Sequence, residues 1–443
     1  MRIFLSAGEA SGDAYGAALV REIRKLIGSD SKSMSDLFGR PVDDQTQLDT
    51  LGMEDSLDVV EYVKSFEDEF GVNIPDEDVP GLKTIGDVRH YIGRKTGLTP
   101  NLAPSKYSFE GIGGPKLKAA GVHLYADSSH WGAISIVQAI KVGFGVYYRM
   151  HGIKKYLRRG TPGVLIAIDF GFANIRLCRY AKKCGWKVLY FVPPGSWRRD
   201  RQGKDLPEIA DEIVTPFEWS ASILRGMGAS AHWFGHPIKQ LIQAQASSVE
   251  RQATVAVLPG SRKHELEMNL PIIAGAAQGL DAQVEFALAP TVDIDDFRRE
   301  WNRLAPGRDD AFTVGDTYSV LRRGRAAIVC SGTATLEAAL CRCPMVVMYQ
   351  LSPGMAREAK LVMRQAPKFI SLPNILMDRE IVPELVGVDR IDPATLRGWL
   401  DKLLVEGDKR HRQLDDFEVL DQILGPSDAI TKTAELAIRM AAS

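Results

Sequence analysis

A chain of 443 residues exceeds what one hydrophobic core usually serves, so two or three domains are expected. Hydrophobic residues make up 45% and charged residues 25%, which is typical of a soluble globular protein, and no apolar run reaches the roughly 20 residues that span a bilayer. The five cysteines show no metal-ligand spacing, and their odd number predicts reduced thiols in the cytoplasm.

Charge is distributed unevenly along the chain. Residues 30–95 hold 16 acidic and 7 basic side chains, a net charge of −9, whereas the whole chain carries −1, so the remainder carries about +8. An acidic block inside a basic host predicts two modules of separate origin.

The first 29 residues predict a strand, a turn and a helix. Ile3-Phe4-Leu5 precedes the turn Ala7-Gly-Glu-Ala-Ser-Gly-Asp13, and apolar residues with helical spacing follow. Such a unit opens a Rossmann-like fold, whose next strand normally follows closely. Because the acidic segment separates this helix from the next candidate strand, within 107–115, we interpret residues 30–100 as an insertion.

Alternation of strands and helices resumes after the insertion. A helical run is predicted at 138–159, a domain boundary near Gly235-His236-Pro237 and a linker at 243–252. Apolar strands are predicted at 164–168, 187–192, 213–214, 255–258, 284–288, 326–330 and 345–349. The expected fold class is α/β, with two Rossmann-like domains facing a cleft (the GT-B architecture) and a small all-α insert. Residues 1–29 and 101–240 form the first domain and 241–443 the second, whose last helix (429–442) packs on a neighbouring domain.

The turn after the first strand holds candidate catalytic residues. Gly8 and Gly12 allow close backbone approach, and the free amides at the helix start favour an anion or a sugar hydroxyl. Glu9, Ser11 and Asp13 supply the polar side chains. The alternative is a tight turn in which Ser11 or Asp13 only caps the helix.

Six motifs then occur in one order along the chain. They are AGEASGD from Ala7, GIGGP from Gly111, FGHP from Phe234, LPGSR from Leu258, SGTATLEAAL from Ser331 with CPMVVMY after it, and SLPN from Ser371. In order and spacing the chain resembles the lipid-A-disaccharide synthases over nearly all residues outside the insert. The resemblance implies an inverting transfer of an acylated glucosamine from UDP-2,3-diacylglucosamine to a 2,3-diacylglucosamine 1-phosphate acceptor in lipid A biosynthesis, without a divalent metal. It also implies a cytoplasmic protein that is peripheral to the inner membrane.

The second domain supplies the nucleotide side of the expected site. Gly260 and Ser261 can offer backbone amides to a diphosphate, and Arg262 can stabilise the charge that develops on a UDP leaving group. The alternative for Arg262 is an ordinary surface arginine.

A second strand-to-helix turn repeats this arrangement. Ser331, Gly332 and Thr333 could hold phosphate, while Glu337 could accept the ribose hydroxyls or merely stabilise the helix end. The family places Asn374 near the nucleotide. For His236, a hinge role and a catalytic role are equally open.

One family motif is altered. Synthases of this family carry Gly-Ile-Asp-x-Pro-Asp-Phe-Asn, whereas this chain has Asp169 and Asn174 but Phe172 in place of the second aspartate, the family's presumed general base. Losing such a base typically costs about 10²–10⁴ in rate. Either Asp169, Glu9 or Asp13 serves as the base, or the acceptor differs, or the chain is an inactive homologue that binds lipid or acyl carrier. Arg198 and Arg199 also replace small and aromatic family residues.

The insert resembles acyl carrier proteins. The resemblance rests on Asp55-Ser56-Leu57 and on the apolar residues with helical spacing that follow. It implies 4′-phosphopantetheine on Ser56, with a phosphopantetheinyl transferase and acyl-loading enzymes as partners. The alternative for Ser56 is a helix cap.

The basic aromatic stretch at 140–159 has three possible roles. It can bind the surface of an anionic membrane, form a core helix with a solvated basic face, or provide a docking face for the acidic insert. No nucleic-acid partner is predicted, because no base-stacking motif accompanies the charge.

Overall fold

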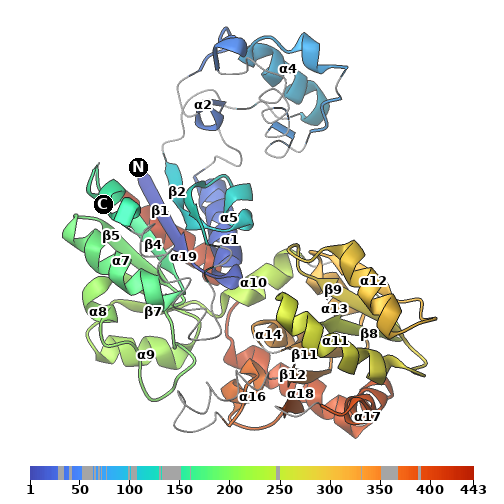
Figure 1. Cartoon of the computed structure of the whole chain (residues 1–443). Helices are drawn as coiled ribbons and strands as arrows, with labels where there is room; N and C mark the ends of the chain where they lie inside the picture. Colours follow the sequence, from blue (N-terminus) through green and yellow to red (C-terminus); the bar gives the residue numbers. More distant parts are fainter. Residues whose placement is uncertain are drawn as a thin grey trace. The chain divides into compact units, whose positions relative to one another are not determined.

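Two open parallel sheets organise the chain in the computed structural model (Figure 1). The structure describes residues 1–27, 34–38, 42–51, 63, 66–67, 70, 72–75, 77–97, 100, 107–128, 131, 151–159, 161–245, 250–330, 332–350, 368–387 and 391–443, with only the backbone at a few of them, including Phe172. The two sheets confirm the predicted α/β class with two Rossmann-like domains.

The first sheet has seven parallel strands among the described residues, in the order β3-β2-β1-β4-β5-β6-β7. Their bounds are β1 (Arg2–Ala7), β2 (Ser108–Gly113), β3 (His123–Asp127), β4 (Val164–Ile168), β5 (Lys187–Phe191), β6 (Glu212–Thr215) and β7 (Ala231–Trp233). The chain builds outward from β1 to β3, returns, and then builds from β4 to β7. The order therefore reverses between β1 and β4, which makes their carboxyl ends a topological switch point.

The second sheet repeats this plan with six strands among the described residues, in the order β10-β9-β8-β11-β12-β13. Their bounds are β8 (Thr254–Leu258), β9 (Gln283–Leu288), β10 (Ala311–Val314), β11 (Ala326–Cys330), β12 (Met345–Gln350) and β13 (Glu384–Gly387). Here the order reverses between β8 and β11. Both strands are buried throughout, as expected for central parallel strands covered on two faces.

Helices accompany both sheets. In the first part of the chain they are α1 (Ala10–Leu26), α5 (Pro115–Ala119), α7 (Gly171–Lys183), α8 (Leu206–Ile209) and α9 (Glu218–Gly226). In the second part they are α10 (Pro237–Ala244), α11 (Lys263–Ala277), α12 (Ile294–Leu304), α13 (Thr317–Arg323), α14 (Ala334–Leu340), α16 (Leu372–Met377), α17 (Pro393–Leu404) and α18 (Asp408–Ile423). Of the helical run predicted at 138–159, residues 151–158 are helical and 138–150 lie outside the described residues.

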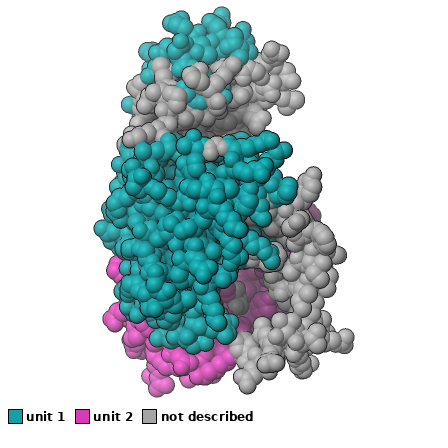
Figure 2. All heavy atoms as spheres, turned by 90° about the vertical axis from the view of Figure 1, so that its left-hand side faces the viewer, with its two compact units in different colours: residues 1–134, 138–234, 428–443 teal, residues 135–137, 235–427 magenta. Residues whose placement is uncertain are grey.

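The chain divides into two compact units (Figure 2). Unit 1 contains the described residues up to Phe234 together with Asp428–Ser443, and unit 2 contains Gly235–Ser427. The last helix, α19 (Ala429–Ala442), lies against α1, β4 and β5 of unit 1 (Figure 1). Thr431 donates a hydrogen bond to Glu22 of α1, which ties the end of the chain to its beginning.

The insert has a small apolar core of its own. Its described elements are α2 (Met34–Leu37), the 3₁₀ turns η1 (Asp49–Leu51) and η2 (Val79–Gly81), and α4 (Ile85–Thr96). Helix α4 begins with a capping box between Thr84 and Asp87 and ends at Gly97 in the left-handed conformation. The core cluster consists of Met34, Leu48, Phe66, Phe70, Val72, Ile74, Ile85, Val88, Tyr91 and Ile92.

Two glycines of the first turn have different packing roles. A Cβ atom built on Gly8 would lie 2.0 Å from Cγ of Phe170, far closer than two non-bonded carbon atoms can approach. A Cβ atom on Gly12 would meet its nearest neighbours at 3.5 Å, an ordinary contact. Close backbone approach is therefore required at Gly8 and not at Gly12.

Substitution of these two glycines by alanine gives a matched test of this packing. We expect Gly8→Ala to lower the free energy of unfolding by about 1–3 kcal/mol, because the Phe170 ring must move. Gly12→Ala should leave it unchanged or raise it by up to about 1 kcal/mol, because alanine favours the helix. Urea denaturation measures both, and equal effects of the two substitutions would contradict this interpretation.

Candidate functional site

The switch point of unit 1 brings two carboxylates together. Ala7 at the end of β1 pairs with Ile168 at the end of β4, so the residues that follow these strands emerge side by side. Glu9 is the N-cap residue of α1 and is exposed, without a side-chain cap hydrogen bond. Asp169 is the first residue after β4.

Asp169 and Phe170 both lie in the left-handed backbone region, which is uncommon for non-glycine residues. The φ of Asp169 is 48°, and the φ of Phe170 is 45°. The Asp169 carbonyl oxygen accepts hydrogen bonds from the Tyr190 hydroxyl and the Asn174 side-chain amide, both at 2.9 Å. Strained non-glycine residues of this kind persist only where surrounding contacts hold them, and they cluster at functional sites.

The environment of Asp169 favours its protonated form. Burial, followed by the negative charge of nearby Glu9, raises the pKa of Asp169 to about 6. A carboxylate with a pKa near 6 is ionised at neutral pH and still basic enough to take a proton from a hydroxyl as that hydroxyl reacts. Of the carboxylates proposed from sequence as the base, Asp169 has the environment that suits the task.

Asp13 has a different role. Its side chain is buried and accepts the backbone N–H groups of Gly114, Lys116 and Leu117 at 2.8–3.0 Å. These are the free amides at the start of α5, so Asp13 joins α1 to α5. The proposal of Asp13 as a catalytic base is corrected, because both carboxylate oxygens are already engaged. Ser11 lies half-buried in the first turn of α1.

Asn174 is likewise a structural residue. It is fully buried, and its Oδ1 accepts a hydrogen bond of 2.6 Å from the Ser6 hydroxyl. Its Nδ2 lies within hydrogen-bond distance of the carbonyl oxygens of Ser6, Ile168 and Asp169. Its amide joins the ends of β1 and β4 and holds the turn at Asp169, and a contact between Asn174 and substrate stays a prediction.

The switch point of unit 2 brings together the two glycine-containing loops. Residues 258–262 follow β8, and residues 331–337 follow the neighbouring strand β11. The buried side chain of Asn269 in α11 contacts both strand ends, with Nδ2 at 3.1 Å from the Pro259 carbonyl oxygen and 3.0 Å from Sγ of Cys330. Asn269 therefore connects the ends of the two neighbouring strands from which these loops begin.

An internal carboxylate already occupies part of the first loop. Oε2 of Glu265 accepts the backbone N–H groups of Ser261 and Arg262 at 3.2 and 3.3 Å, and Oε1 pairs with the Arg262 guanidinium at 3.0 Å. Gly260 has a φ of 102°, and a Cβ atom there would lie 2.7 Å from Oε2 of Glu265. Of the groups that the sequence assigned to UDP, the Ser261 amide and the Arg262 guanidinium thus contact the Glu265 carboxylate.

The second loop is exposed. Gly332 has a φ of 126°, a conformation that favours glycine, and Thr333 is the N-cap residue of α14. Glu337 is half-buried and accepts a hydrogen bond of 3.3 Å from the Tyr318 hydroxyl. Ser331 lies outside the described residues.

The side chain of Asn374 has a structural role. It is fully buried: Nδ2 donates to Val382 and Glu384, and Oδ1 accepts the N–H groups of Ile381 and Val382. Four hydrogen bonds use its amide to hold the loop before β13, and the expected contact of Asn374 with the nucleotide stays a prediction.

His236 has a capping role at the start of unit 2. Its Nδ1 accepts the N–H of Ile238 at 3.2 Å, which caps α10. Burial, followed by the charge of Lys239, lowers the pKa of His236 to about 3, so the ring is neutral. Of the two roles left open by the sequence, this geometry favours the structural one.

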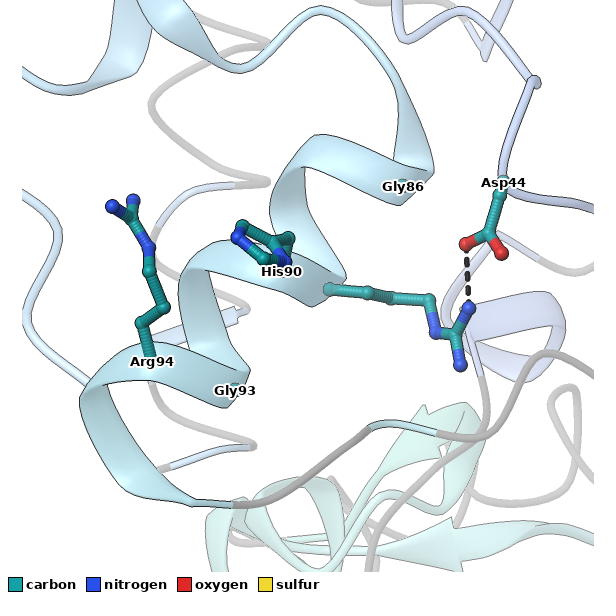
Figure 3. Close-up of a pocket in the computed structure, with 6 residues that line it drawn as sticks. Asp44, Gly86, His90, Gly93 and Arg94 are labelled. Carbon is teal, nitrogen blue, oxygen red and sulfur yellow. Dashed lines mark hydrogen bonds and ion pairs between the residues drawn. The ribbon is translucent and has the colours of Figure 1, made fainter.

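The insert contains two hollows. One, of about 380 Å³, is largely apolar and is lined by residues that include Val63, Phe66, Leu82 and Val88. The other, of about 410 Å³, lies along α4 (Figure 3). It is lined by Gly86, His90, Gly93 and Arg94 of this helix and by Asp44, which pairs with Arg89. Ser56 lies outside the described residues.

Sequence reasoning missed Glu265, Asn269 and Tyr190. Glu265 follows Arg262 at the spacing of a helical capping box, which is a local signal that could have identified it. Asn269 and Tyr190 carried no such signal, because their partners come from other strands.

Two family models match the chain. The model for lipid-A-disaccharide synthetase matches residues 96–435, and the model for a phosphopantetheine attachment site matches residues 32–92. The lipid-A-disaccharide synthase of Anaeromyxobacter dehalogenans is 32% identical over 349 residues, which cover 73% of this chain and 88% of that protein.

Solved structures support the fold. MnaA of S. aureus, solved with UDP, is 10% identical, with a TM-score of 0.52, and the match covers 100% of this chain and 98% of that one. The glycotransferase of kitacinnamycin is 14% identical, with a TM-score of 0.50, and the match covers 76% of this chain and 92% of that one. At these identities the likeness concerns the fold alone, and it agrees with the predicted GT-B class.

Proposed function

We propose that this chain, which belongs to the lipid-A-disaccharide synthase family, transfers a diacylglucosamine from UDP-2,3-diacylglucosamine to a hydroxyl of a 2,3-diacylglucosamine 1-phosphate acceptor. The observation that carries the proposal is the Glu9–Asp169 pair at the switch point of unit 1, where the raised pKa of Asp169 suits a general base. Unit 2 provides the matching nucleotide side, with two glycine-containing loops at its own switch point.

Unit 2 binds the donor. The amides of Ser261 and Arg262 take the diphosphate in place of the Glu265 carboxylate, and the Arg262 guanidinium stabilises the charge that grows on the leaving UDP. Gly332 and Thr333 complete the phosphate contacts, Ser331 adds its hydroxyl, and Glu337 accepts the ribose hydroxyls.

Unit 1 activates the acceptor. The Asp169 carboxylate takes the proton of the acceptor hydroxyl as its oxygen bonds to the anomeric carbon, and the bond from that carbon to the diphosphate oxygen breaks with its electron pair leaving on UDP. One displacement of this kind inverts the anomeric centre. Glu9 keeps the Asp169 carboxylate basic through its negative charge, and Asn174 and Tyr190 hold the turn in place.

The insert adds a carrier function. The match to a phosphopantetheine attachment site supports 4′-phosphopantetheine on Ser56, loaded by a phosphopantetheinyl transferase and acylated by acyl-loading enzymes. The apolar hollow beside Val63 and Phe66 offers room for an acyl chain within the module.

A second candidate function is favoured by Phe172, which cannot accept a proton where the family has its presumed base. In that case the chain is a noncatalytic binding protein that responds to lipid or to the acyl carrier. Release of UDP from the donor separates the two functions, because binding alone releases none.

The lipid substrates require access to a membrane surface. No helix among the described residues is long and apolar enough to cross a bilayer. We therefore propose that the protein docks peripherally on the cytoplasmic face of the inner membrane, using the basic aromatic stretch at 140–159. Most of this stretch lies outside the described residues.

Replacement of the Asp169 carboxylate tests its role as the base. We expect Asp169→Asn to lower kcat by about 10²–10⁴. The wild-type rate should decrease as the pH is lowered through about 6, where Asp169 becomes protonated. Glu9→Gln should shift this acidic limb of the pH–rate profile to lower pH, because removing the neighbouring charge lowers the pKa of Asp169. Measured pH–rate profiles with an unshifted acidic limb in Glu9→Gln would contradict the pairing.

Thermal unfolding provides a control on the same variant. Because the folded-state pKa of Asp169 is raised, its ionisation opposes folding as pH rises from about 4 through 6. Asp169→Asn should therefore raise Tm at pH 7 relative to wild type while activity is lost, which distinguishes a catalytic defect from a folding defect.

Calorimetric titration with UDP tests the loop after β8. Arg262→Gln should weaken UDP binding by about 10–100-fold, through loss of charge-assisted hydrogen bonds. Glu265→Gln should strengthen it a few-fold, because a neutral amide competes less well for the loop amides and frees Arg262. Glu267→Gln removes the same charge two residues along and should change little. Equal weakening by Glu265→Gln and Arg262→Gln would instead make Glu265 part of the binding scaffold.

Intact-mass analysis tests the carrier function. Incubation with coenzyme A and a phosphopantetheinyl transferase should add the mass of one phosphopantetheinyl group to the wild-type chain. Ser56→Ala should abolish this shift, whereas Ser65→Ala should retain it. An unshifted wild-type mass would count against the carrier assignment.

A further inference from the structure

The loop after β5 leaves the sheet in a strained conformation beside the Asp169 turn. Val192 has a φ of 55°, which is unusual for a β-branched residue, and its N–H bonds to the Val214 carbonyl oxygen at 2.8 Å. The loop then packs on the start of α7: a Cβ atom built on Gly171 would lie 2.6 Å from Cγ of Pro194. The segment 193–201 therefore begins in contact with the turn that carries the candidate base.

Hydrogen bonds fix this loop on unit 1. The Trp219 indole N–H donates to the Ser196 carbonyl oxygen at 3.1 Å, and the Ser196 hydroxyl donates to the Pro193 carbonyl oxygen. Gln202 is buried: its amide donates to the Arg198 carbonyl oxygen at 2.9 Å and accepts from the Ser220 hydroxyl at 3.0 Å. Buried polar contacts at both ends of the loop fix its backbone, and this restricts the positions of the side chains that it carries.

Two arginines of this loop lie over tryptophan rings. The Arg198 guanidinium is 5.1 Å from the ring centroid of Trp197, and that of Arg199 is 4.2 Å from the ring centroid of Trp219. Trp219 is itself stacked on Phe217, with centroids 4.6 Å apart and planes 6° apart. A guanidinium group over an aromatic ring is attracted by the negative face of that ring, which favours a fixed position for the arginine side chain.

The loop carries net positive charge on an accessible surface. Residues 197–201 hold three arginines and one aspartate, and that aspartate, Asp200, pairs with Arg201 at 3.7 Å. Arg198 has no carboxylate partner among the described residues, and Trp197 is 43% exposed.

We propose that Arg198 and Arg199, supported by Trp197 and Trp219, bind the phosphate group of the acceptor and so set the preference of unit 1 for a phosphorylated sugar. The proposal rests on the proposed transferase function and names a specificity determinant for it. Guanidinium groups match the oxygens of a phosphate, and the loop that carries these two begins in contact with the turn that carries Asp169.

Steady-state kinetics of the full chain, with phosphorylated and dephosphorylated acceptors, test this assignment. The double variant Arg198→Gln/Arg199→Gln should raise KM for the phosphorylated acceptor at least about tenfold, with kcat within about twofold. Its KM for the dephosphorylated acceptor should not change. Arg198→Lys/Arg199→Lys should recover part of the loss, because lysine keeps the charge but not the fork. Arg21→Gln, on the exposed side of α1, is the matched charge control.

A binding measurement keeps the test independent of turnover. Tryptophan fluorescence of the wild-type chain should change on titration with glucosamine 1-phosphate and not with glucosamine, and the double variant should lose this response. Equal affinity of the double variant and wild type for glucosamine 1-phosphate would overturn the proposal. If wild type binds glucosamine 1-phosphate through these arginines but releases no UDP from the donor, the transferase function fails and the phosphate site remains.

Vesicles distinguish a membrane headgroup from the acceptor phosphate. If the double variant loses binding to phosphatidylglycerol vesicles but still binds glucosamine 1-phosphate, the loop is a membrane contact and the proposal is wrong. Retained UDP affinity and an unchanged circular dichroism spectrum show that the double variant is folded.

Discussion

The buried amide of Asn174 is the contact on which the unit 1 site depends. Its hydrogen bonds join Ser6 at the end of β1 to Ile168 and Asp169 at the end of β4, and they hold Asp169 in the left-handed region. A backbone of that shape brings the Asp169 carboxyl near Glu9. These hydrogen bonds stabilise the turn, because two consecutive non-glycine residues at positive φ are uncommon without supporting contacts.

In unit 2, too, a buried asparagine joins the ends of two neighbouring strands, but the chemical groups around it differ. Asn269 contacts the ends of β8 and β11, as Asn174 does for β1 and β4, so each switch point is held by a buried asparagine. In unit 1 the neighbouring groups are carboxylates, which suit proton removal. In unit 2 they are amides, glycines and an arginine, which suit an anion, and the Glu265 carboxylate occupies them in the absence of ligand. The two units thus have complementary charge preferences.

Three departures from the family pattern bear on the acceptor side of the reaction. Phe172 replaces the presumed base, Arg198 and Arg199 add positive charge beside the Asp169 turn, and the carrier-like insert interrupts unit 1. The loops of unit 2, by contrast, keep the family motifs. The three departures all lie in unit 1, the unit that is proposed to activate the acceptor.

The sequence by itself determined the central strands, the two-unit α/β class, the insert and the family, because long apolar runs and ordered motifs are local signals. Four strands went unpredicted, β3, β7, β10 and β13, and all are edge strands with partly exposed residues that lack such a run. Only the tertiary structure decided which polar motif residues are free to react. Asp13, Asn174 and Asn374 belong to motifs, yet each is buried against backbone groups of another segment, as when Asp13 caps a helix about a hundred residues away. Burial and hydrogen-bond partners arise from packing between segments, which no local pattern records.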